Sequence, residues 1–144
     1  IPQEILESSQ KKGHWDNQPD GPLVWRRSVY VFRRRSLGFP CFDTFDLPDQ
    51  NQTAAARNVS TVPTQALTLM NNEFVLKQAA LFAERLEKEA PGNRDRPIEL
   101  AYQIALTRSP TKAEAAVAKA LVIEQSLGDL THVMLNLNEF LYLR

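Results

Sequence analysis

Two kinds of sequence meet in the stretch Asn58-Val59-Ser60-Thr61-Val62-Pro63-Thr64-Gln65-Ala66-Leu67-Thr68-Leu69-Met70-Asn71-Asn72-Glu73-Phe74-Val75. Polar residues lead up to Pro63, whose fixed φ and missing N–H suit the first turn of a helix. Apolar residues follow until Asn71, and Asn72 can cap the next helix through its side-chain oxygen. The stretch therefore predicts an irregular, aromatic-rich part over residues 1–62 and a helical part over residues 63–144.

The C-terminal part carries four further segments with helical signals. Residues 73–89 repeat apolar side chains at helical spacing, and Pro97 opens a segment that stops before Ser109-Pro110. Thr111 and Glu114 form a capping box for a helix that should run to residue 127, with Gly128 at its left-handed C-terminal position. Asp129 is expected to cap a final helix. With the helix that Pro63 opens, the sequence predicts about five helices.

The N-terminal part favours a small extended element near residues 28–45. Residues 28–32 are rich in β-branched and aromatic side chains, which are typical of a strand, and residues 41–45 could pair with them. Such a strand would be apolar on both faces and would need cover on both sides. We therefore expect a mainly α domain that exposes an apolar patch beside residues 25–32.

Composition excludes several classes of function. The 144 residues carry 17 basic and 17 acidic side chains, so no overall basic excess attracts nucleic acid or an anionic membrane. No apolar run is long enough to insert into a membrane. The two histidines, His14 and His132, lack metal-ligand spacing, and the single Cys41 is expected to be a small buried hydrophobe. The start at Ile1-Pro2 suggests a fragment of a longer chain.

The polar side chains around the opening stretch form the best candidate site. No motif such as G-x-S-x-G accompanies Ser60, Thr61 or Thr64, so hydrogen bonding to the helix entrance is favoured over nucleophilic catalysis. Loss of a cap, as in Thr61→Ala or Asn72→Ala, should then cost about 1 kcal/mol. The candidate residues are Arg57, Asn58, Thr61, Gln65, Asn71 and Asn72.

A second candidate combines basic and acidic side chains. The arginines could bind an anion or RNA, whereas the carboxylates could serve glycoside hydrolysis or hold calcium. Internal salt bridging between the two sets is favoured, because the acidic stretch directly follows the basic one and lacks a calcium-loop pattern. The set consists of Arg26, Arg27, Arg33, Arg34, Arg35, Asp43, Asp46 and Asp49.

Several motifs, taken in order, resemble one protein family. They are the Trp25–Phe32 run, the Phe45–Asp49 run, the Arg57–Val75 run, the segment Arg108-Ser109-Pro110-Thr111-Lys112-Ala113-Glu114, and the closing Leu135–Tyr142 run. Together they resemble the planctomycete-type C-terminal domain of unknown function found in large bacterial proteins with cytochrome c-like modules. Two positions depart from that pattern: Ala56 where a second basic residue is expected, and Asn72 where aspartate is common.

The resemblance implies an extracytoplasmic bacterial parent protein whose upstream part is missing here. It implies haem on a separate module and none in this chain, and it supplies no catalytic residues. We therefore expect a non-catalytic structural or interaction module, whose partners are other domains of the parent or a second copy. The alternative is part of a redox or carbohydrate-active enzyme, with an active site that the missing N-terminal portion completes.

Overall fold

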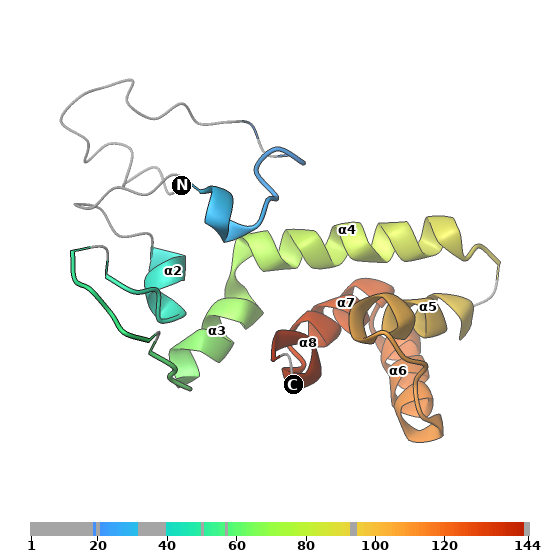
Figure 1. Cartoon of the computed structure of the whole chain (residues 1–144). Helices are drawn as coiled ribbons and strands as arrows, with labels where there is room; N and C mark the ends of the chain where they lie inside the picture. Colours follow the sequence, from blue (N-terminus) through green and yellow to red (C-terminus); the bar gives the residue numbers. More distant parts are fainter. Residues whose placement is uncertain are drawn as a thin grey trace. The chain divides into compact units, whose positions relative to one another are not determined.

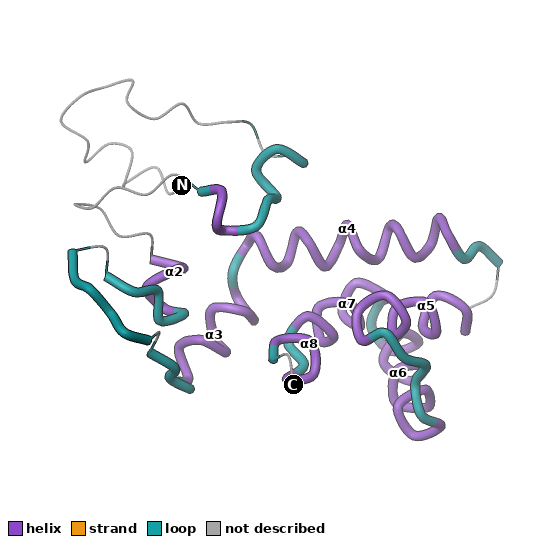
Figure 2. Tube along the Cα trace, viewed as in Figure 1, coloured by secondary structure: helices purple, strands orange, loops and turns teal. Residues whose placement is uncertain are grey.

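The computed structural model describes residue 19 and residues 21–31, 40–49, 51–56, 58–92 and 95–142. They fall into two compact units, Ile1–Thr61 and Val62–Arg144. Every regular element among these described residues is helical and none is a strand (Figures 1 and 2). The mainly α class is therefore confirmed.

The described residues of the first unit form helical turns where the sequence predicts an extended element. Ser28–Tyr30 is a 3-10 helix, η1, because the N–H groups of Tyr30 and Val31 bond the carbonyls of Arg27 and Ser28. The expected pairing partner is itself a short helix, α2 (Pro40–Thr44), opened by a proline. The predicted pairing of these segments is wrong, because local bonds in each segment replace it.

The end of α2 explains one of the predicted carboxylates. Asp46 has φ +56°, and the N–H groups of Asp46 and Leu47 bond the carbonyls of Asp43 and Phe42. This pattern is a Schellman motif, in which the chain turns left-handed after the last helical residue. Aspartate tolerates this conformation better than most residues do, so Asp46 serves as the helix terminator.

The second unit contains six helices among its described residues. They are α3 (Pro63–Asn71), α4 (Glu73–Glu89), α5 (Asp95–Leu106), α6 (Lys112–Glu124), α7 (Leu127–Leu135) and α8 (Asn138–Leu141). The predicted end of α6 at Leu127 is wrong, because the helix stops at Glu124 and Gly128 lies inside α7. Ser126, not Asp129, caps α7 by accepting the Asp129 N–H at 3.1 Å.

The junction of α3 and α4 follows the sequence prediction at two of its three positions. Pro63 begins α3, and the Asn72 side chain accepts the Phe74 N–H at 2.9 Å to cap α4. Thr61, however, caps nothing, because Val62 occupies the N-cap position of α3 and no side chain bonds there. A proline in the first turn leaves fewer N–H groups to satisfy, which removes the need for a hydroxyl cap.

Asn72→Ala is expected to lower the free energy of unfolding by about 1 kcal/mol, because the first turn of α4 loses its capping oxygen. Urea denaturation measures the change. Thr61→Ala is the matched control and should change the free energy by less than about 0.5 kcal/mol. Equal effects of the two substitutions would contradict the assignment of Asn72 as the cap.

The core of the second unit lies where α4, α5, α6 and α7 meet. Figure 1 shows the long helix α4 with α5 and α7 along one side, and these helices are in contact. The buried side chains are Leu86, Ile98, Ala101, Tyr102, Leu106, Ala118, Leu130 and Met134. A buried hydroxyl joins α7 to α4, because Thr131 Oγ1 donates to the Ala79 carbonyl at 2.8 Å.

Candidate functional site

The structure distributes the predicted polar site over both units. Asn58 and Thr61 are exposed in the first unit, and Arg57 lies outside the described residues. In the second unit Gln65 is buried, and Asn71 Nδ2 donates to the Leu67 carbonyl at 2.9 Å. The Asn71 and Asn72 side chains thus form hydrogen bonds with nearby backbone groups. A site shared by the six candidate residues stays a prediction.

The predicted basic and acidic set is described only in part, because Arg33, Arg34 and Arg35 lie outside the described residues. Asp46 Oδ2 accepts the Ser60 N–H and hydroxyl, each at 2.7 Å. Asp49 accepts the Asn51 N–H at 2.9 Å, and Asp43 is exposed. Loop bonding therefore occupies two of these carboxylates, whereas their pairing with Arg33–Arg35 stays a prediction.

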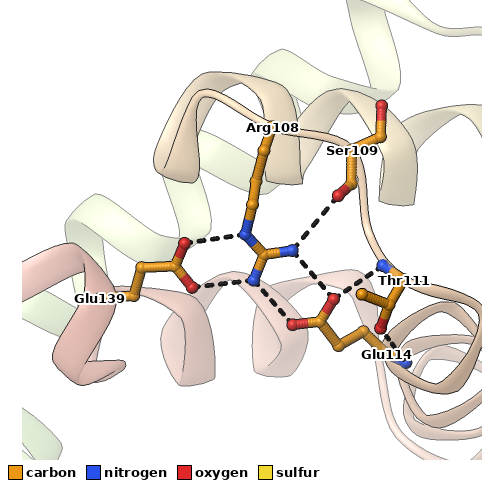
Figure 3. Close-up of polar contacts among 5 residues, drawn as sticks. All are labelled: Arg108, Ser109, Thr111, Glu114 and Glu139. Carbon is orange, nitrogen blue, oxygen red and sulfur yellow. Dashed lines mark hydrogen bonds and ion pairs between the residues drawn. The ribbon is translucent and has the colours of Figure 1, made fainter.

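The best-developed polar cluster among the described residues surrounds Arg108, just after α5 (Figure 3). The guanidinium meets Glu139 of α8 through Nε and Nη2, both at 2.8 Å. It meets Glu114 of α6 through Nη2 at 2.7 Å and Nη1 at 2.9 Å. We call Arg108, Ser109, Thr111, Glu114 and Glu139 the Arg108 cluster.

Each N–H donor of Arg108 has an acceptor within the cluster. A guanidinium has five N–H groups. Four donate to the two carboxylates, and the fifth, on Nη1, donates to the Ser109 carbonyl at 3.2 Å. The arginine also lies over the Tyr102 ring, with Cζ 5.7 Å from its centroid. No donor remains for an anionic ligand, so the cluster acts as a clamp between α5, α6 and α8.

The cluster also fixes the charge of its members. The bond from Arg108, assisted by the N–H and hydroxyl of Thr111, lowers the pKa of Glu114 from 4.5 to about 2. The bonds to Glu139 and Glu114 raise the pKa of Arg108 above its ordinary value. Because Glu114 stays ionised at neutral pH, it is unsuited to general-acid chemistry, which needs a protonated carboxyl group.

Two local features place Arg108 and Glu114 within reach of each other. Glu114 is fixed by the predicted capping box, since its carboxylate accepts the Thr111 N–H at 2.7 Å while Thr111 Oγ1 accepts the Glu114 N–H. Thr107 ends α5 with φ +58°, and its N–H bonds the Gln103 carbonyl. A β-branched residue is disfavoured in this left-handed conformation, so the turn into Arg108 is strained.

Thr107→Gly is expected to raise the free energy of unfolding by about 0.5–1 kcal/mol, because glycine adopts a positive φ without a Cβ clash. Thermal denaturation measures the change, and Thr111→Gly is the contrasting control. Thr111 has φ −67° and caps α6, so its replacement should destabilise the protein. Destabilisation by Thr107→Gly would show that the Thr107 hydroxyl, which donates to the Leu106 carbonyl, outweighs the strain.

The sequence predicts the capping box of Thr111 and Glu114, but it does not predict the pairing of Arg108 with Glu139. These two residues are 31 positions apart, and no local pattern relates them. The available signal was that both lie in segments that carry the family resemblance, Arg108–Glu114 and Leu135–Tyr142. The structure joins the two segments through one guanidinium.

The remaining candidates for chemistry are ordinary structural groups. Burial raises the pKa of the Cys41 thiol, which disfavours the reactive thiolate. His132 Nε2 lies 3.4 Å from the Leu69 carbonyl oxygen. Within the described ranges, no three histidine, cysteine or acidic side chains gather as metal ligands. No helix in that part of the chain is both long and apolar enough to span a membrane.

Comparison with known proteins places the chain in a family. No curated protein and no solved structure matches it. The family model described as "PSD1: Protein of unknown function (DUF1553)" matches residues 2–122, which is most of the chain. Glu139 lies beyond the matched residues, whereas Arg108 and Glu114 lie within them. The chain therefore belongs to the DUF1553 family of proteins of unknown function.

Proposed function

We propose that this chain is a non-catalytic interaction module of a larger extracytoplasmic bacterial protein. Its partners are other domains of that parent or a second copy of the chain. The parent carries or meets cytochrome c-like modules, so haem is held on those modules and not by this chain. The extracytoplasmic location and the cytochrome association rest on the resemblance of the motifs to the planctomycete-type domain.

The observation that carries the proposal is the exposure of large apolar side chains within residues 23–30. Leu23, Val29 and Tyr30 are 62%, 70% and 73% exposed. Single exposed apolar residues are normal on a protein surface, but contiguous ones mark contact sites. These three lie within eight consecutive residues, so the first unit presents them in one segment.

The chemistry of the Arg108 cluster supports an interaction module over an enzyme. In the second unit, Arg108 forms ion pairs with Glu114 of α6 and Glu139 of α8, and these pairs link the two helices. An active site generally keeps a titratable group poised near the working pH or a donor directed at an open position. The Arg108 cluster has neither, because each guanidinium donor is engaged.

The test is a binding measurement between this chain and the rest of the parent protein, produced as separate chains. Isothermal titration calorimetry should detect association, and the cytochrome-like module should keep its haem absorption spectrum. The parent protein should also be assayed for turnover of a redox dye or a polysaccharide. If Asn71→Ala abolished such turnover while association stayed intact, the enzyme interpretation would be favoured instead. Absence of association would overturn the proposal.

A further inference from the structure

We infer that residues 21–31, here called the exposed basic segment, form a docking surface for a protein partner with carboxylates around an apolar centre. The inference rests on the proposed interaction function and names the chemistry of the partner. The segment reads Gly21-Pro22-Leu23-Val24-Trp25-Arg26-Arg27-Ser28-Val29-Tyr30-Val31 and contains no acidic residue. It therefore carries two positive charges and no internal counter-charge.

The two guanidinium groups have no partner in the described part of the chain. Arg26 and Arg27 are both exposed, and neither side chain makes a hydrogen bond or ion pair there. They differ from Arg85 and Arg108, which are paired with glutamates at 2.7 Å. Planar guanidinium groups are suited to bidentate bonds with carboxylates, so a partner can supply the counter-charge that the described residues do not.

The backbone turns of this segment are closed by their own bonds. The Gly21 carbonyl accepts the N–H groups of Val24 and Trp25 at 2.9 and 3.2 Å. In η1, Tyr30 N–H and Val31 N–H bond carbonyls three residues back. Because these four local bonds close the turns, the segment can present Val29 and Tyr30 without ordering an extended loop first, which lowers the entropic cost of binding.

The side-chain types favour a protein partner over a lipid surface or RNA. Tyrosine and arginine are enriched in the energetically dominant positions of protein interfaces, whereas lysine is depleted there. The segment contains both enriched types and no lysine. Binding to a membrane surface through a helix needs a long amphipathic helix, and η1 has only three residues.

The test selects peptides from a phage-displayed random library on the whole chain, and measures the affinity of the enriched peptides by fluorescence anisotropy. The expected consensus contains Asp or Glu next to Leu, Phe or Trp. Arg26→Ser/Arg27→Ser and Val29→Ser should each weaken binding by about 30-fold, as for dominant interface residues. Circular dichroism checks that the variants keep the helical content of the wild type.

Two matched controls lie on the second unit. Arg96 of α5 is also exposed and without an ion pair, and Val117 of α6 has the same 70% exposure as Val29. Arg96→Ser and Val117→Ser should leave peptide affinity unchanged. An equal loss in these controls would overturn the inference, because it would place peptide binding elsewhere on the chain.

Further outcomes would also refute this docking surface. Enrichment of no peptide, or of a consensus without acidic residues, would overturn the inference. Tighter binding to phosphatidylglycerol vesicles or to oligouridylate, lost in Arg26→Ser/Arg27→Ser, would overturn it in favour of a lipid or RNA surface. Binding of the parent protein that is insensitive to Val29→Ser and Arg26→Ser/Arg27→Ser would leave the proposed function standing while refuting this surface.

Discussion

Leu86→Ala is expected to lower the free energy of unfolding by about 3 kcal/mol, within the 2–5 kcal/mol range for such core truncations. Leu86 is completely buried near the C-terminal end of α4 and belongs to the core cluster with Ile98 and Met134. Truncation removes three carbon atoms from the interface of α4 with the other core helices. Because α4 is a continuous 17-residue helix, its backbone cannot readily close the cavity that results.

A matched substitution on the same helix separates packing from helix propensity. Leu76 of α4 is 45% exposed, so Leu76→Ala should change the free energy by less than about 0.5 kcal/mol. Urea denaturation of both variants, with equal slopes against urea concentration, gives the comparison. A loss below about 1 kcal/mol for Leu86→Ala would contradict the assignment of this residue to the core.

Glu114→Gln is expected to remove one contribution to the acid sensitivity of the second unit. The pKa of Glu114 is 4.5 ordinarily and about 2 in the folded protein. A carboxyl group with a lowered folded-state pKa stabilises the protein fully above pH 4.5, and this stabilisation is lost as the pH falls toward 2. Unfolding between pH 2 and pH 4.5 should thus take up protons at this residue, and Glu114→Gln should abolish that uptake.

The measurement is the free energy of unfolding as a function of pH, from which the proton uptake is the slope. Glu99→Gln is the control, because Glu99 is an exposed residue of α5 whose side chain makes no hydrogen bond or ion pair among the described residues. The control removes the same charge without breaking the Arg108 cluster, so it should change the slope less than Glu114→Gln does. Glu114→Gln should also weaken protection of α8 amides from hydrogen exchange, since Arg108 links the two helices. An unchanged slope would contradict the role of Glu114 in the clamp.

Local sequence determined where several helices begin, because caps act over a few residues. Pro63 opens α3, Asn72 caps α4, and Thr111 with Glu114 forms the capping box of α6. Each signal depends on backbone groups within three or four positions, so a linear pattern contains all of it. The mainly helical class and the buried stripe of α4 follow from periodicity for the same reason.

Competition between local structures was harder to predict. The β-branched and aromatic run at residues 28–32 has the composition of a strand, yet Ser28–Tyr30 closes a 3-10 turn. Strand propensity is realised only when a neighbouring strand pairs with the segment, and α2 occupies the expected partner residues. Similarly, the helical periodicity of the sequence continues past Glu124, yet α6 stops there and Ser126 caps a new helix, α7.

Only the tertiary structure decided which distant groups meet. Thr131 donates to the carbonyl of Ala79, 52 positions earlier, and Arg108 bonds Glu139, 31 positions later. These contacts depend on the angles at which α4, α5, α7 and α8 pack, and those angles arise from the shapes of all the core side chains together. The sequence alone determined where α3, α4 and α6 begin and which face of α4 is buried. Helix packing brings carboxylates from two separate helices to Arg108, where they accept four of its five N–H groups while the Ser109 carbonyl accepts the fifth.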